Sequence, residues 1–169
     1  MINIYLQVLA WSLVTAVSRR QLPGREEASL GQVTPRYTWT GHALPVTGIH
    51  VGHGPAHSAR VVSSSLDMTV KIYSMTTGDM LLSVSLTTPV TSIVMDNAET
   101  GVWVGDKAGD IHRVCLLSPP RDVSVTSDSQ GVTSLSRGHE AAVTHLSVSC
   151  DGLSLASGDS EGKLCVIQS

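Results

Sequence analysis

Short runs in which apolar and polar residues alternate recur along this chain. Three of them contain a valine followed by a threonine, and these threonines are Thr47, Thr91 and Thr144, spaced 44 and 53 residues apart. Alternation with a period of two is typical of a strand that buries one face. The pattern therefore predicts three similar strands at a repeating interval.

A second recurring block follows each of these predicted strands. It has two apolar runs joined by a segment of small and polar residues, and its copies are Val61–Tyr73, Val102–Val114 and Leu155–Ile167. Each copy predicts a strand, a tight turn and another strand. When the copies are aligned, the same turn position is occupied by Asp67, Ala108 and Glu161.

Two of the repeats also begin with a Gly-His pair, Gly41-His42 and Gly138-His139. A Gly-His pair, several short strands and a period of about 40–45 residues are the pattern of a WD-repeat blade, which is a small four-stranded antiparallel sheet. The sequence therefore predicts an all-β, partial WD-repeat β-propeller with about three blades and an N-terminal blade stub. Because propellers close with four to eight blades, we expect the chain to be a segment of a longer propeller.

The apolar run at the N-terminus predicts the stub. Ile2–Ser18 has no charged side chain and Arg19-Arg20 follow it, as in a signal peptide or anchor, but polar residues interrupt it and no basic region precedes it. We interpret Tyr5–Trp11 as a buried strand that ends a preceding blade. The predicted divisions are the blade end (1–12), an inter-blade insertion (13–40), a blade (41–88), a degenerate blade (89–118), a Ser/Pro-rich insertion (119–137) and a blade lacking its last strand (138–169).

The Gly-His histidines are the main candidates for a polar network inside the blades. A buried imidazole needs a partner for each ring nitrogen. In the first blade we expect His42 to join Asp67 and one of Ser63 or Ser65, of which we select Ser65. In the third blade we expect His139 to join Ser157. We interpret these networks as structural rather than catalytic.

Composition excludes several other classes of function. The 11 basic and 14 acidic residues give a net charge of −3, which does not favour nucleic-acid binding. The three cysteines are not spaced as a zinc ribbon. There is no Gly-x-Ser-x-Gly elbow and no phosphate-binding loop. We therefore expect no enzyme activity, no catalytic residues, no cofactor and no metal, although His50, His53 and His57 leave open a metal-binding loop as an alternative.

Several segments resemble one family more closely than a generic WD repeat. They are Val8–Leu13, Thr38–Thr47, Ser64–Lys71, Gly78–Val84 and Gly138–Gly162. Together they are similar to the family of WD repeat-containing protein 18. The resemblance covers most of the chain, and the two long insertions contribute nothing to it.

This resemblance implies a non-enzymatic scaffold in a nuclear complex that matures the pre-60S ribosomal particle and supports processing of the precursor-rRNA spacer. The implied partners are protein subunits of that complex, including a proline-, glutamic acid- and leucine-rich scaffold protein, with indirect contact to the pre-60S particle. The implied location is the nucleolus and nucleoplasm, with no small-molecule substrate and no membrane association. The alternatives are a WD-repeat interaction module of another complex, a metal-binding protein, and a secreted or membrane-anchored propeller.

Overall fold

The fold was described from a computed structural model, which covers residues 7–10, 34–55, 58–116 and 132–168. Within these ranges the regular structure consists of strands, arranged as four antiparallel sheets. In two sheets all four strands follow chain order, so each sheet is a simple meander. The predicted all-β fold of WD-repeat blades is confirmed.

The three larger sheets correspond to the three predicted blades. The first blade contains β3 (Val46–Val51), β4 (Arg60–Ser65), β5 (Thr69–Ser74) and β6 (Met80–Ser85). The second contains β7 (Val90–Met95), β8 (Gly101–Asp106), β9 (Asp110–Cys115) and β10 (Val132–Arg137). The third contains β11 (Val143–Val148), β12 (Ser154–Asp159) and β13 (Leu164–Gln168).

The repeated Val-Thr pairs begin the first strand of each blade and form an irregularity there. In each blade the pairing with the second strand shifts register across the threonine, next to Val46, Val90 and Val143. Such a shift is a β-bulge, which bends the strand and increases its twist. The recurring threonine is thus explained by the bulge as well as by alternation.

The two predicted insertions contain strands that the sequence did not reveal. β2 (Tyr37–Trp39) pairs with β1 (Val8–Ala10) in a two-stranded sheet, and β10 pairs with β9 as the fourth strand of the second blade. The boundaries predicted for the insertions at 13–40 and 119–137 are therefore wrong at their C-terminal ends. β2 has only three residues, and β10 is rich in Ser and Thr, so the alternation of apolar and polar residues is weak in both. Trp11 and residues 13–33 and 119–131 of the predicted insertions lie outside the described residues.

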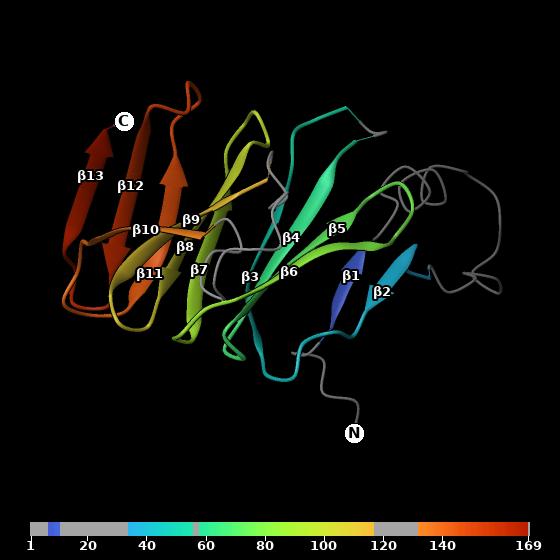
Figure 1. The fold of residues 1–169 in the computed structure, drawn as a ribbon, viewed down its shortest axis with the longest axis horizontal. Coiled ribbons are helices and arrows are strands. Elements are labelled where there is room, and N and C mark those ends of the chain that lie inside the picture. Colours follow the sequence, from blue (N-terminus) through green and yellow to red (C-terminus); the bar gives the residue numbers. More distant parts are fainter. Residues whose placement is uncertain (1–6, 11–33, 56–57, 117–131, 169) are drawn as a thin grey trace, which may run out of the picture.

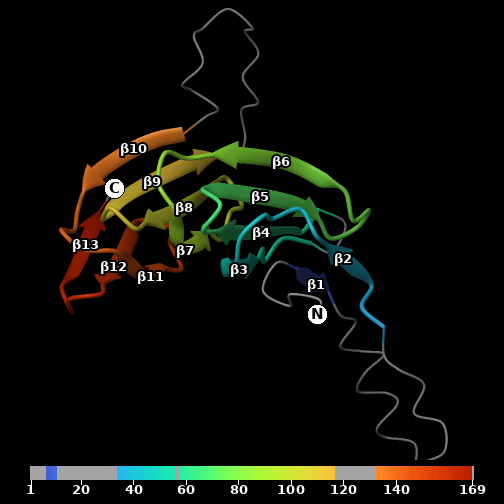
Figure 2. The same cartoon turned by 90° about the horizontal axis from the view of Figure 1, so that it is seen from below.

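The sheets are arranged side by side in an arc (Figures 1 and 2). Figure 2 shows the first strands β3, β7 and β11 along the inner side of the arc, and β6 and β10 along its outer side. β7 contacts both β3 and β11. This is the radial packing of propeller blades.

The core lies between neighbouring sheets. Apolar side chains of the first and second blades meet in one cluster, whose largest members include Ile72, Met95 and Val104. Smaller clusters join β1 and β2 to the first blade, and the second blade to the third. Each fully buried valine or isoleucine contributes about 1.5–3 kcal/mol. The second blade is therefore covered on both faces.

One face of the third blade has no neighbouring sheet among the described residues. On β13 burial alternates, so that Leu164 is 82% exposed and Val166 68% exposed, while Ile167 packs toward the second blade. Such an apolar strand face is the kind that blades of a propeller bury against each other.

Candidate functional site

His42 lies at the centre of a buried polar network in the first blade. Its Nδ1 is 3.0 Å from Asp67 Oδ2, and its Nε2 is 2.7 Å from Ser63 Oγ. Because a carboxylate only accepts hydrogen bonds, Nδ1 carries the proton and Nε2 accepts from the Ser63 hydroxyl in the neutral ring. The network joins the segment before β3 to β4 and to the turn before β5.

Asp67 is held ionised by its hydrogen bonds. Burial alone would raise the pKa of this carboxyl, but hydrogen bonds from Thr69, from the Ala43 amide and from His42 outweigh that effect and lower its pKa to about 2. Thr69 donates to Oδ1 through both its hydroxyl, at 2.6 Å, and its amide, at 3.0 Å. Asp67 therefore also organises the turn between β4 and β5.

Ser65 does not contact His42, and its selection as the hydroxyl partner is wrong. Its hydroxyl donates to the Leu44 carbonyl at 2.9 Å and accepts from the Asp67 amide at 3.1 Å. Ser63 and Ser65 share one face of β4, but Ser65 is the last residue of the strand and is engaged by the turn. The ring of His42 meets Ser63, one strand repeat further from the turn.

The third blade contains a similar network around His139. Its Nε2 is 2.8 Å from Ser157 Oγ and its Nδ1 is 2.9 Å from Asp159 Oδ2. The sequence analysis named His139 and Ser157 but assigned the equivalent turn position to Glu161. The carboxylate that contacts the histidine is Asp159, two residues earlier.

The second blade has no Gly-His pair and uses another histidine. Asp106 Oδ2 is 3.0 Å from His112 Nε2 on β9, and it also accepts from the Thr88 hydroxyl. Burial tends to raise the pKa of Asp106, but hydrogen bonds from His112 and Thr88 reverse the shift and lower it. Asp106 and Asp159 pair with equivalent valines, Val90 and Val143, and this register is the signal that could have identified both.

The loop after β3, which contains His53, contacts a side chain of the second blade. Glu99, from the turn between β7 and β8, is buried against this loop, where its Oε1 accepts from the Gly54 amide at 2.7 Å. A Cβ at position 52 would clash with the same oxygen. The glycines in this loop therefore leave room for a side chain from the neighbouring blade. Sequence analysis missed Glu99 because its partner is 45 residues away.

Two of the three histidines proposed as alternative metal ligands lie near each other, His50 on β3 and His53 in the loop that follows it. The ring centroids of His50 and His53 are 5.9 Å apart, and His57 lies outside the described residues. Burial lowers the pKa of His50, the neighbouring His53 lowers it further, and Glu99 opposes the shift. In the described ranges no group of three or more ligating side chains is placed to hold a metal ion.

Two further observations concern the excluded classes. The cysteines Cys115, Cys150 and Cys165 are all free. Over residues that the structure describes, no helix has the length and apolar character needed to cross a membrane.

The chain was compared with known proteins. The family model described as WD domain, G-beta repeat matches residues 33–74 and 114–168. WD repeat-containing protein 18 of Rattus norvegicus is 40% identical over 153 residues, which is 89% of this chain and 33% of that protein. The protein of the same name from Danio rerio is 42% identical over 130 residues, 75% of this chain and 30% of that protein.

A fungal protein is also similar. Pre-rRNA-processing protein IPI3 of Yarrowia lipolytica is 34% identical over 170 residues, 95% of this chain and 37% of that protein. The chain thus spans about a third of the length of the curated relatives that it matches. The resemblance to WD repeat-containing protein 18 is confirmed, and the family-model match to more than half of the residues, on sheets with the expected meander, shows that the chain belongs to the WD-domain, G-beta repeat family.

Proposed function

We propose that this chain is part of a non-catalytic scaffold in pre-rRNA processing. One observation carries the proposal: most of the chain is similar both to WD repeat-containing protein 18 and to proteins named for pre-rRNA processing. The similarity includes the repeats that build the blades, where the networks around His42 and His139 are found. The scaffold would bring other proteins together during maturation of the large ribosomal subunit.

The geometry of the networks supports a structural role over catalysis. Ser63, His42 and Asp67 have the order of contacts found in a Ser-His-Asp triad. However, Ser63 is fully buried inside β4. A nucleophile must reach its substrate, and Ser63 is shielded from any substrate in this fold. The same holds in the third blade, where Ser157 is also buried.

The partners that we propose are protein subunits of a nuclear ribosome-assembly complex, among them the proline-, glutamic acid- and leucine-rich scaffold protein. The contact with the pre-60S particle would be indirect, and the location would be the nucleolus and nucleoplasm. The resemblance of the blade segments to the family supports these assignments.

The proposal is tested by depleting the protein from its own cells and probing total RNA for precursors that retain the internal spacer. We expect such precursors to accumulate and to return to normal when the wild-type gene is expressed again. A variant with Asp79→Ala, at an exposed position outside the networks, is a matched control that should restore processing. Unchanged precursor levels after depletion would contradict the proposal.

A further inference from the structure

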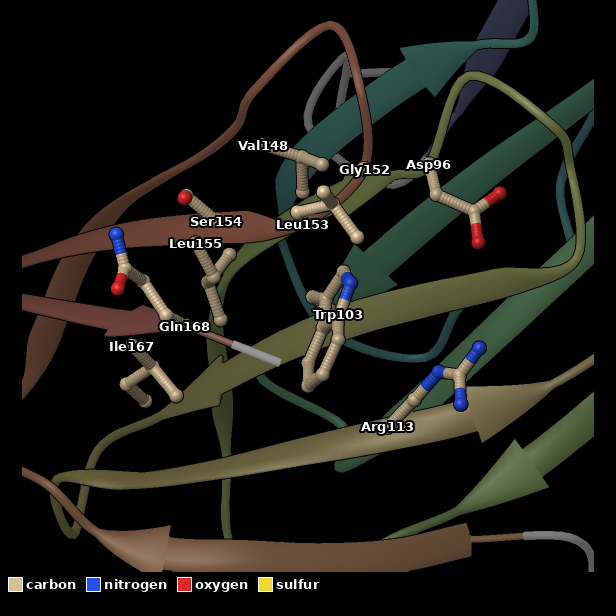
Figure 3. A pocket seen from close by; sticks show the side chains of 10 residues that line it. All are labelled: Asp96, Trp103, Arg113, Val148, Gly152, Leu153, Ser154, Leu155, Ile167 and Gln168. Carbon is tan, nitrogen blue, oxygen red and sulfur yellow. The ribbon is translucent and has the colours of Figure 1, made fainter.

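A pocket opens between the second and third blades, away from the histidine networks. Its volume is about 280 Å³, and the second blade contributes Asp96, Trp103 and Arg113 while the third contributes an apolar wall that includes Leu153 and Ile167. Figure 3 shows Trp103 and Arg113 beside each other on neighbouring strands, with Leu153 across the pocket. Trp103 and Arg113 lie directly opposite each other where β8 pairs with β9.

Arg113 lines this pocket with a cationic guanidinium group. Its Nε is buried and has no hydrogen-bond partner in the described part of the chain. Its guanidinium carbon is 5.5 Å from the centre of the Trp103 ring, so the indole holds the cation in place. A buried donor without a partner is destabilising. Among the described residues the guanidinium group as a whole has no carboxylate partner, so it can receive one from another molecule.

The nearby carboxylate of Asp96 does not fill that role. Its oxygens accept from the Thr100 amide at 2.7 Å and the Thr100 hydroxyl at 2.6 Å. Ion pairs within the described ranges all join a histidine to an aspartate, and none includes Arg113. The charge of Arg113 is therefore available to a ligand.

The other walls of the pocket are largely apolar, so they favour an apolar group beside the carboxylate that Arg113 would bind. Leu153 is 56% exposed at the rim, and Val148 and Ile167 form part of the lining next to Trp103. We infer that this pocket binds a short acidic peptide segment of a partner protein, with a carboxylate on Arg113 and a neighbouring apolar side chain against Leu153. A planar carboxylate matches the donor geometry of a guanidinium, and the apolar contact adds burial.

A peptide fits these observations better than a nucleic acid. Nucleic-acid sites combine several basic residues with free aromatic faces for stacking. Among the described residues that line the pocket, Arg113 is the single cationic side chain, and it already lies over the Trp103 ring. Asp96 in the lining and the net charge of −3 would also repel a polyanion.

This inference rests on the proposed scaffold role, since it names the kind of partner segment that the scaffold holds. Its test is separate, because it uses the purified full chain and a synthetic peptide rather than RNA processing in cells. A defect in one assay can therefore be distinguished from a defect in the other.

The probe is a fluorescein-labelled peptide with one glutamate between a leucine and a valine in a glycine-serine context, measured by fluorescence anisotropy. We expect it to bind the wild-type chain, and the Kd to rise by about tenfold or more in Arg113→Gln. The same peptide with glutamine in place of glutamate should lose binding to a similar extent. Arg36→Gln is the matched control, because Arg36 lies 5.2 Å from the Tyr37 ring outside the pocket, and its Kd should stay unchanged.

A second variant covers the case in which Arg113→Gln disturbs the fold. Leu153→Glu changes an exposed rim position and places a negative charge there, so it should weaken binding while leaving the thermal midpoint unaltered. Equal binding by wild type, Arg113→Gln and Leu153→Glu would overturn the inference. It would also be overturned by no binding to the wild type, or by displacement of the peptide by a single-stranded RNA oligonucleotide.

Discussion

The first and third blades hold equivalent histidines with differently placed acceptors. In the third blade Asp159 accepts all three hydrogen bonds. Its Oδ2 accepts from His139, while its Oδ1 accepts from the amides of Glu161 at 3.0 Å and Lys163 at 2.8 Å. In the first blade the position of Asp159 is occupied by Ser65, which pairs with Val46 as Asp159 pairs with Val143.

The first blade divides the same three donors between two residues. Ser65 accepts from the Asp67 amide, at the position of Glu161, and Asp67 accepts from the Thr69 amide and from His42. The set of donors is thus preserved although the carboxylate has moved by two residues. The turn amides and the histidine therefore need hydrogen-bond acceptors at the same spatial positions in both blades, but different residues can supply them.

The largest effect is expected from removing the carboxylate of the first blade. Asp67→Ala leaves His42 and the Thr69 amide without their acceptor, so the free energy of unfolding should fall by about 1–3 kcal/mol. Urea unfolding of the full chain would measure it. Asp79→Ala, at an exposed turn position, is the control and should change little. An Asp67→Ala chain as stable as the wild type would contradict the network.

Moving the carboxylate from position 67 to position 65 tests whether the two arrangements are interchangeable. In the Asp67→Ala background, Ser65→Asp places a carboxylate at the position that Asp159 has in the third blade. We expect this second change to recover most of the lost stability. If the double variant is no more stable than Asp67→Ala alone, the two arrangements are not interchangeable.

A smaller effect is expected from Ser65→Ala in the wild-type background. The change removes the acceptor of the Asp67 amide and the donor to the Leu44 carbonyl, but it leaves the contacts of His42 in place. A loss of about 0.5–1.5 kcal/mol follows for neutral hydrogen bonds of this kind. A loss larger than that of Asp67→Ala, in the same urea titration, would reverse the ranking.

A further effect concerns acid. Asp67 has a pKa of about 2 in the folded chain, below its ordinary value of 3.8. Its stabilisation is therefore complete above about pH 4 and is lost as the pH falls toward 2. Asp67→Asn should make the decline of stability between pH 4 and pH 2 shallower than in the wild type, as followed by thermal midpoints. Parallel curves would show that another group controls acid unfolding.

The sequence predicted the parts of this fold that depend on local pattern. Alternation around Thr47, Thr91 and Thr144 located the first strand of each blade, and the Gly-His pairs located His42 and His139. These signals are visible because a half-buried strand shows alternating apolar and polar residues, and a tight turn shows characteristic residues, within a short stretch of sequence.

The missed features depend on contacts between distant segments. Asp159 and Asp106 were overlooked because alignment by turn position pointed to Glu161 and Ala108, while the acceptor sits at the strand end. Glu99 reaches the loop of another blade, 45 residues from its partner. The strands β2 and β10 are recognised by their pairing with β1 and β9 rather than by their own composition.

The pocket at Arg113 was equally hidden in the sequence. Arg113 and Trp103 are ten residues apart and become neighbours only through the pairing of β8 with β9. Its apolar wall comes from the third blade, so neither blade alone would reveal the site.

The most direct test of the scaffold role is affinity purification of the endogenous protein from nuclear extract, with the bound proteins identified by mass spectrometry. The account predicts recovery together with factors that assemble the large ribosomal subunit, and their absence from a mock purification. Recovery without any of these factors would contradict the proposed function.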